Sequence, residues 1–244
     1  MANITMITSG KGGVGKSVSC VMLGAALSRL SKKVLIIELD SGLGSLDMMM
    51  GLEDRVVYNI SDVLEGICEP KKAIFKYDHA PSLYLMPATS YLDSDISVKD
   101  ISKLCRGLAG YFDYILLDTP AGIGPMFKAA ALAADSALIV VTPEPISVRD
   151  SSIICNLILE NHIDNVKLII NRVKNDTAKS GAVSDLDSVI DDVGAGLIGV
   201  VPENGEFAKA MSNGDPLNLN NIVSQVYDNI AKRMLGQYAE LLIN

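Results

Sequence analysis

The sequence has no tryptophan, few aromatic residues and no long apolar run. A membrane-spanning helix requires at least ~18 consecutive apolar residues, and the longest candidate, residues 129–141, is interrupted by Asp135. The first residues, Met-Ala-Asn-Ile, also lack the basic and apolar regions of a secretory signal peptide. We therefore expect a cytosolic protein that is not exported.

Cysteines and basic clusters are also scarce. The four cysteines are dispersed without a C-x-x-C pair, so we expect reduced, mostly buried side chains and neither a disulfide nor a metal site; they are Cys20, Cys68, Cys105 and Cys155. The formal net charge is −8, and no Lys/Arg cluster is present. Direct binding of nucleic acid, which depends on neutralising phosphates, therefore has little support.

Apolar residues are abundant, at 49% of the 244 residues. Short apolar runs alternate with helical patterns, which is typical of a mostly parallel sheet covered by helices on both faces. The expected strands are 4–8, 34–38, 83–86, 114–118, 137–141, 166–171 and 197–201. The expected helices are 16–30, 98–109, 126–134, 147–161, 183–192 and 222–238. The length suits one α/β domain over residues 1–244, with 237–244 as a short tail.

Residues 10–17, GKGGVGKS, follow the first expected strand and precede a helix. The glycines let the backbone turn tightly with its N–H groups inward, and the positive end of the helix points to the same place. Lys16 adds a charge for the β- and γ-phosphates, and the Ser17 hydroxyl is a ligand for Mg²⁺. The pattern predicts a P-loop NTPase whose nucleotide-binding residues are Gly10, Lys11, Gly12, Gly13, Val14, Gly15, Lys16, Ser17 and Val18.

The same glycines also match G-x-G-x-x-G, with Glu38 and Asp40 near the offset of a ribose-binding acid. A dinucleotide-dependent oxidoreductase is therefore an alternative, as are a glycine-rich turn without a ligand and a scaffold that does not hydrolyse nucleotide. The pair Lys16-Ser17 has a role in triphosphate binding and none in dinucleotide binding, so it favours the P-loop.

Two carboxylates follow strands that should end near this loop. Asp118 closes the run 114–117 and is predicted to hold Mg²⁺ through water, the alternative being an acid that only caps a turn. Asp40 enters a glycine-bearing loop, residues 41–47, that could respond to the γ-phosphate, and we expect it to position the attacking water. Capping of the following helix by Asp40 or Asp47 is the alternative.

The segment from Lys11 to Ser17 resembles the deviant P-loop of the ParA/MinD ATPases. Residues 40–47 are similar to the D-x-G-L-x-x-L-D segment of the branch that selects the cell-division site, and 118–122 and 143–150 also match that branch. The likeness covers about residues 2–236. Flagellar-number and cargo-positioning members of the family share the core and are the alternative.

The resemblance implies that ATP and Mg²⁺ are the cofactors, with Asn171 and Arg172 facing the adenine. It implies that Lys11 reaches the nucleotide site of a second subunit in an ATP-dependent homodimer. It also implies slow ATP hydrolysis, a division inhibitor and an ATPase-activating protein as partners, and a location in the cytoplasm or at the inner face of the cell membrane.

Three features depart from the family pattern. Val18 stands where a hydroxyl residue often contacts the α-phosphate, and Glu38 stands where an Asp is usual. No Lys or Arg follows Arg233, whereas the related proteins end in a basic amphipathic helix, so membrane association lacks its usual anchor. We expect the apolar stripe of the last helix to pack on the core; it consists of Ile222, Val226, Ile230 and Met234.

Overall fold

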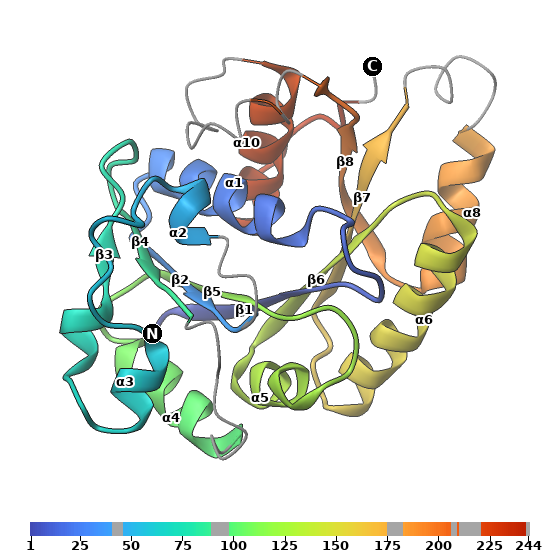
Figure 1. Cartoon of the computed structure of the whole chain (residues 1–244). Coiled ribbons are helices and arrows are strands. Elements are labelled where there is room, and N and C mark those ends of the chain that lie inside the picture. The colour runs from blue at the N-terminus through green and yellow to red at the C-terminus, as the bar shows by residue number, and fades with distance from the viewer. Residues whose placement is uncertain (41–45, 89–97, 175–182, 206–208, 210–220, 243–244) are drawn as a thin grey trace.

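The computed structural model describes residues 1–40, 46–88, 98–174, 183–205, 209 and 221–242. Its strands form one eight-stranded sheet in the order β3-β4-β2-β5-β1-β6-β7-β8 (Figure 1). The strands are β1 (Asn3–Thr8), β2 (Val34–Glu38), β3 (Phe75–Lys76), β4 (Leu83–Met86), β5 (Tyr114–Asp118), β6 (Ser136–Val141), β7 (Val166–Val173) and β8 (Gly196–Pro202). Every pairing is parallel except that of β3 with β4. The predicted fold class, a mostly parallel P-loop sheet, is confirmed.

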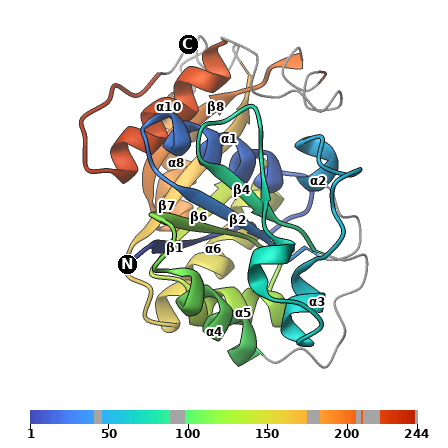
Figure 2. The same ribbon diagram turned by 90° about the vertical axis from the view of Figure 1, so that its left-hand side faces the viewer.

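Helices cover both faces of this sheet. Helices α1, α2 and α10 lie on one face, and α3, α4, α5 and α6 lie on the other, with α8 packed against α6 (Figures 1 and 2). Their bounds are α1 (Lys16–Arg29), α2 (Leu46–Met49), α3 (Ile60–Leu64), α4 (Val98–Leu108), α5 (Pro125–Ala133), α6 (Pro145–Glu160), α8 (Val183–Val193) and α10 (Ile222–Met234), with a 3₁₀ helix η1 (Pro70–Ala73). In the described part of the chain, no helix is long and apolar enough to cross a bilayer.

The two faces bury separate apolar cores because successive strand residues point to opposite sides. Ile4 and Met6 of β1 join the core beneath α4, α5 and α6, whereas Ile7 joins the core beneath α1 and α10. In β2, Leu35 and Ile36 divide between the two cores in the same way. Burial on both faces explains why these strands are continuous apolar runs.

The predicted C-terminal end of the last helix is wrong. Helix α10 ends at Met234, because Gly236 adopts φ 73° and its N–H donates to the carbonyl of Arg233. The N–H of Gln237 donates to Lys232 O at 2.9 Å, which completes a glycine-terminated Schellman motif. The predicted packing of the stripe is confirmed, since Val226 and Ile230 are buried and the other two members pack against the same core.

Three short elements, α2, α3 and η1, and the two-residue strand β3 are absent from the sequence-based prediction. Each is too short to show a period of apolar residues. Helices α5 and α6 begin earlier than predicted, at Pro125 and Pro145, because proline is favoured in the first helical turn.

Candidate functional site

The loop after β1 has the backbone conformation that its glycines predict. Gly13 has φ 77° and Gly15 has φ 94°, both in the left-handed region that favours glycine. A Cβ on Gly15 would collide with the side-chain amide of Asn171, and one on Gly10 would collide with the backbone of Asp150. The first turn of α1, which begins at Lys16, contains no acidic residue. The loop therefore presents the positive end of α1 without a neutralising carboxylate on that helix.

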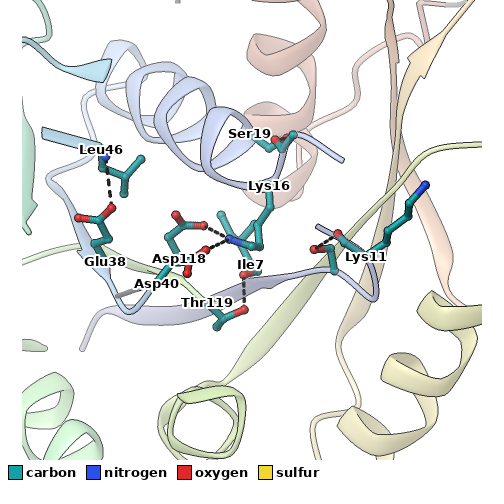
Figure 3. Close-up of polar contacts among 11 residues, drawn as sticks. Ile7, Lys11, Lys16, Ser19, Glu38, Asp40, Leu46, Asp118 and Thr119 are labelled. Atoms are coloured by element: carbon teal, nitrogen blue, oxygen red, sulfur yellow. Dashed lines mark hydrogen bonds and ion pairs between the residues drawn. The ribbon is translucent and has the colours of Figure 1, made fainter. Parts of the chain in front are cut away.

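Lys16 is the cation at the centre of the site (Figure 3). Its Nζ lies 3.0 Å from Asp118 Oδ1 and 3.6 Å from Asp40 Oδ2. Its side chain is only 7% exposed, and that of Asp118 is fully buried. The structure thus brings together residues from α1, the end of β5 and the segment after β2, which the sequence predicted to meet at the carboxyl ends of the strands.

Asp118 has one oxygen free for a further ligand. Its Oδ1 accepts a hydrogen bond from Lys16, and its Oδ2 is buried with no hydrogen-bond partner among the described residues. Burial raises the pKa of the Asp118 carboxyl, and the Lys16 ammonium and the Ser17 hydroxyl beside it act in the opposite direction. A buried, unsatisfied carboxylate oxygen near a serine hydroxyl fits a hard cation such as Mg²⁺.

The strand end that carries Asp118 is tied to the P-loop strand. Thr119 donates to the carbonyl oxygen of Ile7 both from its Oγ1, at 3.0 Å, and from its backbone N–H, at 3.2 Å. The N–H of Gly122 donates to Ser9 O at 3.0 Å. These bonds hold residues 118–122 against the loop and fix the position of the Asp118 carboxylate.

Asp40 and Glu38 have different surroundings, although both lie at the end of β2. The Asp40 side chain is 45% exposed and approaches Lys16, whereas Glu38 is 1% exposed. Glu38 accepts from the backbone N–H of Leu46 at 3.2 Å (Figure 3). It also accepts from the backbone N–H of Ala88 at 3.0 Å. Glu38 therefore holds the backbone at Leu46, directly after residues 41–45. Those five residues, most of the loop predicted to respond to the γ-phosphate, lie outside the described part of the chain.

Lys11 points away from this cluster (Figure 3). Its Nζ lies 2.8 Å from Glu144 Oε2, with side-chain exposures of 42% and 61%. Hydrogen bonding and the charge of Lys11 lower the pKa of the Glu144 carboxyl. In this structure Lys11 therefore forms a surface ion pair within its own chain and contacts neither Asp118 nor Asp40.

The family described as the CobQ/CobB/MinD/ParA nucleotide binding domain matches residues 5–217. The septum site-determining protein MinD of Bacillus subtilis is 38% identical over all of this chain and 92% of its own length. The chain belongs to the MinD branch of this nucleotide-binding family. A MinD structure from Aquifex aeolicus is 39% identical with a TM-score of 0.89, covering 99% of this chain and all of that one. A structure of MinD from Pyrococcus horikoshii complexed with Mg-ADP has a TM-score of 0.82 at 24% identity, covers 96% of each chain and shows the shared fold.

These relatives confirm the predicted family and the predicted assignment to the MinD-type ATPases of cell-division site placement. They favour that assignment over the flagellar or cargo-positioning alternative and over a dinucleotide-dependent oxidoreductase. The contacts of Glu38 agree, because this acid is buried and both of its carboxylate oxygens accept backbone N–H groups, so neither faces a ribose.

The structure places Asn171 near the end of β7, in contact with the loop. Its Nδ2 donates to Val14 O at 2.7 Å, and its Oδ1 accepts from the N–H of Arg172 at 2.9 Å. Arg172 has φ 57°, an uncommon value for a non-glycine residue. Contact of these two residues with adenine stays a prediction.

Sequence reasoning missed two contacts around the site. Glu144 was not recognised as the partner of Lys11, and Tyr227 of α10 was not considered. The Tyr227 hydroxyl lies 2.7 Å from Ser19 Oγ, which in turn donates to Gly15 O at 2.9 Å. Tyr227 is therefore linked through one side chain to the residue that precedes α1. A hydroxyl residue one turn into α1 is the only sequence signal for this link.

Proposed function

We propose that this chain is a Mg²⁺-dependent ATPase that alternates between an ATP-bound dimer and a monomer to control placement of the division site. One observation carries the proposal: Lys16, Asp40 and Asp118 meet at the positive end of α1, in a chain of the MinD family. The Mg-ADP complex of the Pyrococcus horikoshii relative supports this choice of cofactors.

The residues present fit ATP and Mg²⁺. The N–H groups of Gly12 to Ser17 and the end of α1 would receive the phosphates. Lys16 is held by two carboxylates, so phosphate binding would exchange those partners for phosphate oxygens. Ser17 and the free Oδ2 of Asp118 would hold Mg²⁺, directly or through water. The metal, when bound, neutralises phosphate charge.

Asp40 is proposed to position the attacking water. Its side chain is 45% exposed and lies at the solvent side of the cluster, whereas Asp118 is fully buried. Asp40 is therefore open to solvent from the side on which an attacking water would arrive. Phosphoryl transfer depends mainly on positioning and charge stabilisation, so the proposed working groups are a carboxylate, Asp40, and two lysines, Lys16 and Lys11.

Lys11 is proposed to enter the nucleotide site of a second copy. Its ion pair with Glu144 is exposed and therefore screened by solvent, so releasing Lys11 costs little. A second subunit would then complete the site, and ATP would hold the dimer together. The MinC:MinD complex of Aquifex aeolicus supports a division inhibitor as one partner of this chain, with an ATPase-activating protein proposed as another.

We also propose a single nucleotide-binding domain that works in the cytoplasm and at the inner face of the membrane. Residues 236–242 return along α10, where Asn229 Nδ2 donates to Glu240 O and Arg233 donates to Ala239 O. Co-sedimentation with anionic vesicles in ATP and in ADP tests the membrane part. Sedimentation in ATP alone supports recruitment by this chain, and its absence in both states contradicts it.

Light scattering coupled to gel filtration, in Mg²⁺ with ATP or ADP, tests the dimer. We expect wild type to be dimeric only transiently in ATP, Asp40→Ala to accumulate as a dimer, and Lys11→Ala to stay monomeric. Lys128→Ala, an exposed lysine on α5, is the matched control and should behave as wild type. Identical behaviour of all four proteins would contradict the proposed switch.

A further inference from the structure

A hollow lies away from the nucleotide loop, between α3, η1 and α4, the elements at the lower left of Figure 1. Its volume is about 990 Å³, at the upper end of the roughly 300–1,000 Å³ that ligand pockets span. Lys33, directly before β2, and Phe112, just before β5, both line it. The hollow therefore reaches the amino ends of the parallel strands, whereas the P-loop follows the carboxyl end of β1.

The floor of the hollow is apolar and aromatic. Tyr84 of β4 and Phe112 meet edge to face, with ring centroids 5.6 Å apart. Leu104 and Leu108 of α4 are almost fully buried behind them, and Ile74 is half-buried. An apolar floor in a hollow this wide favours a partner that inserts side chains into it.

The rim of the hollow is basic, because four lysines and two acids, Glu69 and Asp100, line it, on a chain whose formal net charge is −8. Lys33, Lys71 and Lys76 are exposed and line the hollow, and none forms an ion pair with a carboxylate among the described residues. The Lys33 ammonium lies 5.0 Å from the Phe112 ring centroid and 5.5 Å from that of Tyr84. A fourth lysine, Lys103, is paired with Asp100 at 3.2 Å.

We propose that this hollow, bounded by Lys33, Lys71, Lys76, Tyr84 and Leu104, binds an acidic amphipathic segment of a partner protein. Apolar side chains of the segment would cover the floor while its carboxylates meet the lysines of the rim. A lipid surface is flat and would reach the rim but not the recessed floor. A nucleic acid would leave that floor uncovered, and the chain as a whole repels it.

This binding site is separate from the proposed function. It uses no residue of the P-loop cluster, and the segment that supplies α3 and η1 follows β2, whereas the loop follows β1. A partner held here would leave the face around Lys11 open for the second subunit. Peptide binding in the hollow and ATP hydrolysis at the P-loop can therefore each be present without the other.

Fluorescence anisotropy with a designed peptide tests the proposal. The probe is a fluorescein-labelled amphipathic peptide of about four helical turns, with Leu and Phe at helical spacing among Glu residues. Reference peptides replace either every Glu by Lys or every Leu and Phe by Ser. We expect the full-length wild-type protein to bind only the acidic amphipathic peptide, with amide shifts in ¹⁵N spectra concentrated at α4 and β4.

Charge reversal at the rim locates the contact. We expect Lys76→Glu to raise the Kd for the acidic peptide about fivefold or more, because an attraction at the rim becomes a repulsion. Lys128→Glu makes the same charge change at an exposed position outside the hollow and should leave the Kd within about twofold of wild type. Circular dichroism of both variants checks that the fold is intact.

Three results would overturn the inference. The first is absence of binding by the acidic amphipathic peptide, and the second is equal binding of that peptide by the two charge-reversal variants. The third is binding to phosphatidylglycerol vesicles, sensitive to Lys76→Glu, with no binding of the peptide, which would assign the rim to lipid.

Discussion

Replacing Lys16 by methionine tests the electrostatics at the centre of the site. Methionine keeps most of the length of the side chain and removes its charge. Asp118 is fully buried and is held by the Lys16 ammonium at 3.0 Å, so the variant leaves a buried carboxylate without its cation. Asp40 also loses this neighbour, but its exposed carboxylate is solvated by water.

The loss of stability in Lys16→Met can be estimated from the distance between the two charges. Two unit charges 3.0 Å apart interact by about 5.5 kcal/mol at an effective dielectric constant of about 20. Removing one partner of a buried pair typically costs about 3–5 kcal/mol, because the remaining charge stays desolvated. We expect Lys16→Met to lower the free energy of unfolding by about 3 kcal/mol or more at pH 7, out of the roughly 5–15 kcal/mol of a typical domain.

The stability difference between wild type and Lys16→Met should depend on pH, through the Asp118 carboxyl. Burial raises the pKa of Asp118 in the folded state, and Lys16 opposes this rise, so its removal raises that pKa further. A carboxyl with a raised folded pKa stabilises the fold below its unfolded pKa and loses this contribution as pH rises through the folded value. The difference in stability between wild type and Lys16→Met should therefore be larger at pH 7 than at pH 5.

Urea denaturation followed by circular dichroism measures this, since the chain has no tryptophan to report by fluorescence. The control is the double variant Lys16→Met/Asp118→Asn, in which the buried group is neutral, and it should recover about half of the loss or more. A loss below about 1 kcal/mol at pH 7 would refute this reasoning. So would an equal loss at pH 5, or a double variant no more stable than the single one.

Three further changes test neighbouring contacts. Gly15→Ala should lower the free energy of unfolding in urea by about 2–3 kcal/mol, because alanine is strained at a positive φ and its Cβ displaces the Asn171 amide. The double variant Gly15→Ala/Asn171→Ala should lose less than the sum of the two single variants, because both disturb the same contact. Tyr227→Phe should cost about 1 kcal/mol and weaken ATP binding measured by calorimetry, while Tyr238→Phe, at an exposed position, should change neither. Glu38→Gln should lower the free energy of unfolding, measured by thermal denaturation, by about 1–2 kcal/mol. Glu38→Asp should lower it by a similar amount, because the shorter side chain cannot reach both backbone N–H groups.

The sequence predicted local features well. The bounds of β2, β4 and β5 match the expected runs, because strands buried on both faces are continuous apolar segments. The backbone of the P-loop was also predictable, since Gly13 and Gly15 provide the two left-handed conformations that the turn requires. Lys16 and Asp118 could be paired because both follow strands that end at the same edge of the sheet.

Contacts between distant positions could not be predicted in this way. Lys11 and Glu144 are 133 residues apart, and Ser19 and Tyr227 are 208 apart, so no local pattern connects them. Glu38 was compared with a ribose-binding acid because its offset from the glycines was suitable, yet burial directs its oxygens to backbone N–H groups. The end of α10 had a local signal in Gly236, which the apolar pattern beyond it obscured.

Release of phosphate from ATP, measured in Mg²⁺ as a function of protein concentration, tests the central claim most directly. We expect a slow rate whose specific activity rises with protein concentration, because a second subunit must supply Lys11. We also expect loss of this rate in Asp40→Ala and in Lys11→Ala while ATP binding persists in both. A specific activity independent of concentration, with Lys11→Ala as active as wild type, would contradict the claim that two copies complete the site.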